Sequence, residues 1–263
     1  MPEGHTIHRL ARDLNRDLKG KCVSASSPQG RFHAGAKTID SQQCRGFEAF
    51  GKHLVGHFGD VDVLHVHLGL IGKFRPTSGD PIGAVRLRLT GPDEERNWDL
   101  RGPMVCTVGP PDLAESVADS VGPDPLRRSG KSADFIDAMS RRRIAVGAAL
   151  LDQKVVAGIG NVYRAELLFL AGISPTTPAN QLSSDDVMQI WDLASAQLRQ
   201  GVKLNRIVTV DPTEVGSTTV RAIPRGDRLY VYKREGDPCR RCATPIAMSE
   251  VGGRKLWHCP TCQ

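Results

Sequence analysis

Two Cys-x-x-Cys pairs near the C-terminal end of the sequence are the residues best suited to chemistry. Cys239 pairs with Cys242 and Cys259 with Cys262, and sixteen residues separate the two pairs. Four thiolates at this spacing are typical of a closed tetrahedral site, which predicts one structural zinc ion. A finger of about twenty-five residues has too little core to fold alone, so the metal would supply its folding free energy.

The segment that carries these cysteines is basic. Positions 225–263 contain eight Lys or Arg against four Asp or Glu, an excess of four in a chain whose formal net charge is +6. A metal-held basic hairpin favours a polyanionic partner such as nucleic acid. The alternative is a zinc-bound knob that only fixes the C-terminus and whose charges are solvated.

The composition of the 263 residues is that of a globular protein with room for two domains and a finger: 40% hydrophobic and 24% charged. No apolar run approaches the roughly 20 residues that a membrane span needs, and the N-terminus lacks a secretory signal pattern. The remaining cysteines, Cys22, Cys44 and Cys106, are scattered and odd in number, which favours a reducing compartment. We therefore expect a cytoplasmic protein that does not bind a membrane.

The N-terminal half of the sequence changes its period once. Apolar residues at three- and four-residue steps predict an amphipathic helix over the first twenty residues. From about residue 22 to 108 the period is two, with strand-like runs at 53–58, 61–68 and 85–90, which predicts an antiparallel β-sandwich or barrel. His65 and His67 would share one face of a strand; without a third ligand nearby, we interpret them as polar face residues.

A stretch rich in Pro, Gly, Ser and Asp, 110–130, predicts a domain boundary. Helical periods follow, and they predict helices over 132–139, 141–153, 161–170 and from a capping box at Ser183 to Gly201. Residues 202–234 have no clean period. The fold class is thus α+β and multidomain: a helix and sandwich in 1–115, a helical domain in 125–215 and a β-hairpin zinc finger in 225–263.

Three patches together resemble one family. They are Pro2-Glu3-Gly4, the run Ala-Gly-Ile-Gly-Asn-Val-Tyr-Arg-Ala-Glu over 157–166, and the finger with Val-Gly-Gly-Arg over 251–254. Their order and spacing, over essentially the whole chain, are similar to those of the formamidopyrimidine-DNA glycosylase and endonuclease VIII family. Pro-Glu-Gly and Tyr-Arg-Ala-Glu look more like the endonuclease VIII branch. The resemblance implies that 125–215 is a helix-two-turns-helix DNA-binding domain.

The resemblance also implies a catalytic centre at the start of the chain. The activity would be that of a bifunctional DNA glycosylase and abasic-site lyase of base-excision repair, acting through a Schiff base on Pro2 and β,δ-elimination. Removal of Met1 would free Pro2 as a secondary amine, and an α-amino group with a pKa near ~8 has a neutral fraction at physiological pH. Glu3 would shuttle protons, and Lys52 would contact the phosphate near the sugar.

Other residues are assigned to DNA contacts by the same resemblance. His67, Asn161 and Arg254 would contact phosphates, and Leu70 would fill the void left by a flipped base, unless it is a buried strand-end leucine. Glu166 resembles a lesion-pocket carboxylate; the alternative is a helix surface charge. The expected partner is damaged DNA, either duplex or single-stranded. We expect the protein to bind it as a monomer and, in a bacterium, to be associated with the nucleoid.

One departure bears on the substrate. The branch that acts on oxidised guanine carries an Arg-Phe-Gly loop, whereas here Arg101 is followed by Gly102, which favours oxidised pyrimidines. A non-catalytic zinc-finger protein that binds damaged DNA is the alternative function. A transcription-associated zinc ribbon is a third, but it gives the 157–166 run no purpose.

Overall fold

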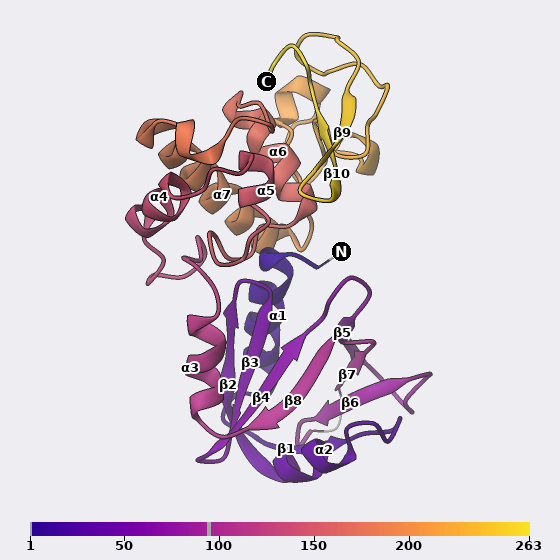
Figure 1. The fold of residues 1–263 in the computed structure, drawn as a ribbon. Coiled ribbons are helices and arrows are strands. Elements are labelled where there is room, and N and C mark those ends of the chain that lie inside the picture. The colour runs from indigo at the N-terminus through magenta and orange to yellow at the C-terminus, as the bar shows by residue number, and fades with distance from the viewer. Residues whose placement is uncertain (1, 94–95) are drawn as a thin grey trace. The chain divides into compact units, whose positions relative to one another are not determined.

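The computed structural model describes residues 2–93 and 96–263, and the chain divides into two compact units, Met1–Ser120 and Val121–Gln263. The first unit consists of a long helix, a sheet and two short helices (Figure 1). The long helix is α1 (Gly4–Leu18), whose apolar stripe is buried as its period predicts.

The sheet of the first unit has eight antiparallel strands in the order β5-β7-β6-β1-β2-β3-β4-β8. Strand β1 belongs to both halves of this sheet, because Cys22 and Val23 pair with β2 whereas Ser24 to Ser26 pair with β6. In chain order the strands are β1 (Cys22–Ser26), β2 (Gln42–Phe50), β3 (His53–Phe58), β4 (Asp62–His67), β5 (Lys73–Thr77), β6 (Val85–Thr90), β7 (Asn97–Arg101) and β8 (Val105–Gly109).

Both halves of the sheet face one hydrophobic core. That core contains α1 residues such as Leu14, β3 and β4 residues such as Leu54 and Leu64, and residues of the other half such as Leu87 and Trp98. The predicted sandwich is therefore a single sheet that folds over its own core at β1. The helix-plus-sheet prediction is confirmed.

Two short helices of the first unit were not expected from the sequence. They are α2 (His33–Ile39) and α3 (Asp112–Asp119). Only Ala36 and Ile39 of α2 are buried, and two buried positions are too few to show a helical period in the sequence. The helix α3 lies inside the stretch whose composition predicts a domain boundary. The charged residues of α3 suit an exposed helix as well as a linker, so composition did not reveal the helix.

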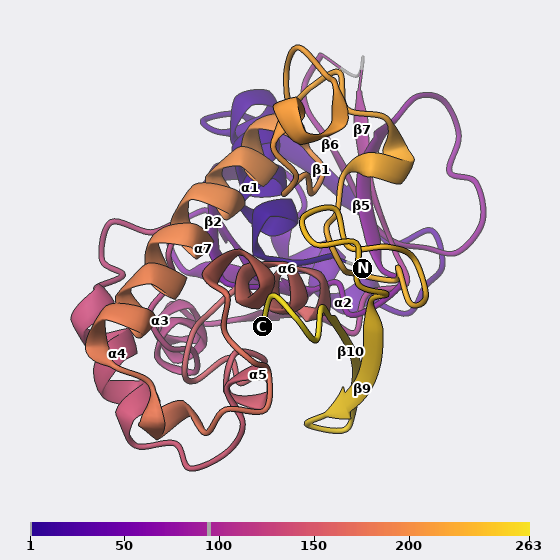
Figure 2. The ribbon, with the colours of Figure 1, turned by 90° about the horizontal axis from the view of Figure 1, so that it is seen from above.

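The second unit is helical up to its C-terminal hairpin. Its helices are α4 (Ser132–Ser140), α5 (Val146–Ala149), α6 (Asn161–Ala171) and α7 (Ser184–Leu204), with 3-10 turns at Ala179–Gln181, Pro212–Val215 and Arg225–Asp227. The hairpin consists of β9 (Ala247–Val251) and β10 (Arg254–His258). Helix α6 lies between α7 and this hairpin (Figure 2). Val251 and Leu256 join the helical core, so the finger and the helices share buried surface.

Most predicted helices of the second unit are confirmed, and one is wrong. The capping box is present: Ser183 and Asp186 satisfy each other's backbone N–H groups at the start of α7. The expected helix over 141–153 is reduced to the four residues of α5, because the backbone N–H groups of Val146 and Gly147 donate to the 175–177 loop instead. No helix in the described part of the chain has both the length and the apolar character to cross a membrane.

Candidate functional site

The N-terminal dipeptide with catalytic potential stands at the first turn of α1. Glu3 is the N-cap residue of the helix, its carbonyl accepts from the Thr6 N–H (2.9 Å), and its side chain is fully buried. Pro2 directly precedes it and is partly exposed. A buried carboxylate beside the secondary amine that loss of Met1 would create on Pro2 suits proton transfer during nucleophilic attack. Met1, whose removal the mechanism requires, lies outside the described residues.

The packing of α1 on β2 brings Glu3 to the end of the sheet where Lys52 lies. Asn15 of α1 donates to the Phe47 carbonyl and accepts from the Phe47 N–H, both at 2.7 Å, and Gly20 donates to the Cys44 carbonyl. Helix and strand therefore run in opposite directions. From Asn15 back to Glu3 the helix rises about 18 Å, and from Phe47 on to Lys52 the strand rises about 17 Å.

His67 joins Lys52 at this end of the sheet. It is the last residue of β4 and pairs with His53, the residue after Lys52. Burial, and then the charge of Lys52, lower the pKa of His67, so its imidazole is neutral near pH 7. The Nδ1 atom of His67 accepts from the Gly69 N–H (3.2 Å). The ring proton is therefore on Nε2, where it can donate to an anion.

Two further histidines lie against His67. His53 is stacked on His65 (ring centroids 5.1 Å apart) and tilted against His67 (4.7 Å), and its Nδ1 lies 2.9 Å from His65 Nε2. Burial lowers the pKa of His53 to about 4, with smaller contributions from the two neighbouring histidines and Lys52. The predicted shared face of His65 and His67 is thus a row of three neutral imidazoles. The sequence did not indicate His53, since strand pairing alone brings it there.

Leu70 is exposed, in contrast to the alternative of a buried strand-end leucine. Its side chain is 64% exposed, that of Ile71 80% and that of Met104 67%. Gly69 makes the turn possible with φ +65°, and a Cβ on Gly69 would lie 3.1 Å from the Met104 Cβ. Two loops therefore present a small apolar surface next to His67. Met104 was not predicted, because no sequence pattern links it to Leu70.

In the second unit, Asn161 at the start of α6 and Arg254 at the start of β10 lie close together. Asn161 is the first residue of α6, and its Nδ2 donates to the Lys255 carbonyl (3.0 Å) in β10. Arg254 follows the hairpin turn Gly252-Gly253, and its side chain is exposed. Both glycines have positive φ, as a two-residue hairpin turn requires. A helix N-terminus, an amide and an exposed guanidinium together suit a phosphate.

The four predicted zinc ligands converge. One ligand atom from each of Cys239, Cys242, Cys259 and Cys262 lies within 4.8 Å of the others, and two Sγ–Sγ distances are 3.9 and 3.4 Å. Tetrahedral Zn–S bonds of about 2.3 Å separate sulfur atoms by about 3.8 Å, so the residues fit the ion. With four thiolates the coordination is closed, which makes the zinc structural.

Glu166 is neither on the surface nor open to a ligand. Its carboxylate is fully buried and accepts from the backbone N–H groups of Tyr230 (2.8 Å), Val231 (2.9 Å) and Tyr232 (2.8 Å), and from the Thr209 hydroxyl. The alternative of a helix surface charge is therefore wrong. The carboxylate ties the irregular segment 209–232 to α6, so any effect on the lesion would be exerted through that segment.

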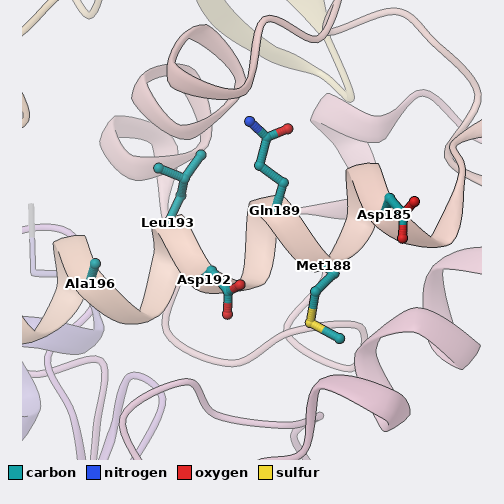
Figure 3. A pocket seen from close by; sticks show the side chains of 6 residues that line it. All are labelled: Asp185, Met188, Gln189, Asp192, Leu193 and Ala196. Carbon is teal, nitrogen blue, oxygen red and sulfur yellow. The ribbon is translucent and has the colours of Figure 1, made fainter.

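A surface pocket on α7 has the wrong charge for DNA. Its lining side chains all come from this helix: Asp185, Met188, Gln189, Asp192, Leu193 and Ala196 (Figure 3). Two carboxylates and no basic group among them would repel a polyanion. The pocket therefore contributes nothing to the candidate site.

Comparisons with known proteins identify the family of the chain. Family models match the formamidopyrimidine-DNA glycosylase N-terminal domain over residues 1–105, the H2TH domain of the same enzymes over 121–212, and the zinc finger found in FPG and IleRS over 236–263. "Endonuclease 8 1" of Mycobacterium tuberculosis is 41% identical over 271 residues and covers all of both chains. This chain belongs to the formamidopyrimidine-DNA glycosylase and endonuclease VIII family.

Other relatives of the family extend the match. The formamidopyrimidine-DNA glycosylase of Ligilactobacillus salivarius is 38% identical, with 100% of this chain and 98% of the relative covered. The solved complex of Lactococcus lactis Fpg with DNA containing an abasic site has a TM-score of 0.82 at 25% identity and covers 99% of each chain. Family membership confirms three predictions: the fold, one structural zinc, and a DNA glycosylase with abasic-site lyase activity in base-excision repair.

Proposed function

We propose that this protein removes oxidised pyrimidines from DNA and then cleaves the strand, with Pro2 as nucleophile. Support comes from Glu3, which is fully buried directly after Pro2 and at the same end of the sheet as Lys52 and His67. The substrate class follows from the name of the 41% identical relative, endonuclease 8, and from Gly102 in place of the Phe expected after Arg101.

The reaction begins when the neutral Pro2 nitrogen attacks C1′ of the damaged nucleotide. The N–C1′ bond forms, the glycosidic bond breaks, and the base leaves with the electron pair of that bond and with the proton that the Pro2 nitrogen releases. Glu3 supplies a proton to O4′ as the sugar ring opens to an iminium ion. The iminium makes a 2′ proton acidic, so loss of that proton expels the 3′ phosphate. Loss of a second proton, from C4′, then expels the 5′ phosphate.

The remaining residues have roles in binding. Lys52 and the Nε2–H of His67 would hold phosphates near the sugar, and Leu70 with Met104 would fill the space of the flipped base. Asn161 and Arg254 of the second unit would bind phosphates of the same DNA molecule. We further propose 1–115, 125–215 and 225–263 as the catalytic, helix-two-turns-helix and finger domains of a monomer that acts in the cytoplasm and, in a bacterium, on the nucleoid.

Borohydride trapping on DNA with an abasic site tests the nucleophile. The wild type should form a covalent complex, whereas Pro2→Gly or a chain that retains Met1 should lose at least ~100-fold in trapping rate, since a covalent route is removed. Equal trapping by the variants would show that another amine reacts. DNA binding without trapping or cleavage by the wild type would favour the non-catalytic alternative.

A panel of oligonucleotides tests the substrate class. Duplex and single-stranded DNA with 5-hydroxyuracil, thymine glycol, 8-oxoguanine or an abasic site would be compared for cleavage and trapping. We expect the two pyrimidine lesions to be cleaved faster than 8-oxoguanine. The reverse order would overturn the assignment to oxidised pyrimidines while leaving the proline mechanism intact.

A further inference from the structure

A buried arginine of α6 contacts both phosphate-binding groups of the second unit. Arg164 is 0% exposed. It donates to Asn161 Oδ1 (2.6 Å) and to the carbonyls of Val251 (2.9 Å), Arg254 (3.3 Å) and Lys255 (3.1 Å). We infer that Arg164 is a positioning residue, which holds the Asn161 amide and the hairpin end that carries Arg254 in the geometry that phosphates require. The inference rests on the proposed function, which assigns both groups to DNA.

Packing alone does not explain an arginine at this position. A guanidinium stays charged in proteins, and its burial is costly even where its N–H groups are satisfied. The acceptors described for Arg164 are an amide oxygen and four carbonyls, the fourth being that of Gly147 (3.0 Å). An apolar side chain would fill this core at a lower cost in free energy. The arginine therefore has a task that depends on the directional N–H donors of its two terminal nitrogens.

One task is to orient the Asn161 amide. Because a guanidinium only donates, the amide atom that faces Arg164 must be the oxygen. The Nδ2 group then points to the Lys255 carbonyl and uses one of its two protons there. The second proton is the one that would donate to a DNA phosphate. Without Arg164 the amide could turn over and present an acceptor to an anion.

The other task is to fix the hairpin end. Val251 and Arg254 pair directly across the Gly252-Gly253 turn, and Arg164 bonds the carbonyls of both. The two strands are thereby tied to the first turn of α6 at the point where the Arg254 side chain emerges. Arg164 thus supports both Asn161 and Arg254 and fixes their positions relative to each other for binding to a phosphate backbone.

A double-mutant cycle separates positioning from a general effect on folding. Arg164→Lys and Arg164→Met would each be placed in the wild type and in an Asn161→Ala/Arg254→Ala background. Affinity for duplex DNA with an unreactive abasic analogue is then measured by fluorescence anisotropy over a series of salt concentrations. In the wild type we expect a loss of about tenfold or more, the worth of a charge-assisted contact, and a salt slope lower by about 1. In the double-variant background the loss should be below twofold.

Affinities are expressed per zinc-loaded molecule, and melting temperatures are recorded for all proteins. Equal losses in both backgrounds, as misfolding would give, or no loss in the wild type would overturn the inference. Arg234→Met is the matched control, because Arg234 is also mostly buried and donates to the carbonyls of Tyr230 (2.7 Å) and Pro238 (2.9 Å). It should change affinity less than twofold. If wild-type protein neither traps nor cleaves abasic DNA, the proposed function fails instead.

Discussion

Single residues decide whether this scaffold can do its chemistry, and several have surroundings that suit one task. Glu3 is buried next to Pro2, the proposed nucleophile, His67 has its proton on the nitrogen that can reach an anion, and Leu70 is apolar yet exposed. Such combinations are uncommon in purely structural positions, since large apolar side chains in contiguous exposed groups usually mark interaction sites.

Leu70 gives a prediction that distinguishes DNA intercalation from folding. Because its side chain is 64% exposed, Leu70→Ala should change the free energy of unfolding by less than about 0.5 kcal/mol. Cleavage of a base-paired lesion should slow by roughly tenfold, whereas an abasic site in single-stranded DNA, which needs no void filled, should be cleaved normally. Val61→Ala, at another exposed apolar position, is the control. Equal slowing on both substrates would contradict the wedge role.

Glu166 gives a prediction about stability. In Glu166→Gln, one oxygen becomes an NH2 group that faces backbone N–H donors, so at least one donor loses its acceptor. We expect the free energy of unfolding to fall by about 2–3 kcal/mol, measured by urea denaturation, with Asp185→Asn on exposed α7 surface as control. An unchanged midpoint would show that the 209–232 segment is held by other contacts.

At the scale of elements, strand pairing assembles what sequence distance separates. The ladder between β3 and β4 places His53 opposite His67, and the opposite directions of α1 and β2 bring Glu3 level with Lys52. These alignments depend on register, which a period of two does not specify. The sequence could therefore predict the strands but not the histidine row, and Pro2 as nucleophile stays a prediction.

The histidine row predicts a dependence of stability on pH. His53 has a pKa of about 4 in the folded protein against about 6.5 when unfolded, so the unfolded chain binds more protons between these values. The contribution of neutral His53 to the free energy of unfolding is fully present above pH 6.5 and is lost as the pH falls toward 4. We expect His53→Gln to flatten the decline of unfolding free energy in this window by less than about 1 kcal/mol per pH unit, given its partial exposure. If the unfolding free energies of the wild type and His53→Gln fall in parallel over this pH window, the prediction is contradicted.

Contacts between residues distant in the sequence also explain what the sequence did not predict in the second unit. The capping box at Ser183 and the four cysteines are local signals, and both were predicted correctly. The helix expected over 141–153 is wrong because Val146 and Gly147 bond to a loop thirty residues away. Arg164 was visible in the family-like run, but only the fold shows that it is buried under the hairpin.

For the whole molecule, the zinc finger and the helices behave as one folding unit. Val251 and Leu256 of the hairpin belong to the helical core, and Phe169 of α6 belongs to the core around the cysteines. Loss of the metal should therefore disturb more than the finger, and the Arg164 guanidinium would lose three of its carbonyl acceptors.

Zinc removal tests this coupling. A strong chelator should release one zinc per chain, lower the melting temperature of the second unit by more than about 10 °C and abolish DNA binding, because metal binding supplies folding free energy. Calorimetry with metal analysis would check this, and the transition of the first unit should be unchanged. Restoration by added zinc is the control. An unshifted melting profile would show that the finger is not coupled to the helices.

The burial of Glu3 imposes an order of events on synthesis. The hydrophobic core that α1 joins includes residues of β7 and β8, so α1 cannot be sealed in place until the chain has grown to about Gly109. At typical translation speeds this leaves roughly 5–20 s during which the N-terminus is extended. An aminopeptidase that removes Met1 needs such an extended segment. Maturation of the proposed nucleophile Pro2 has this interval before folding, and a chain that keeps Met1 should bind DNA normally while remaining inert in trapping.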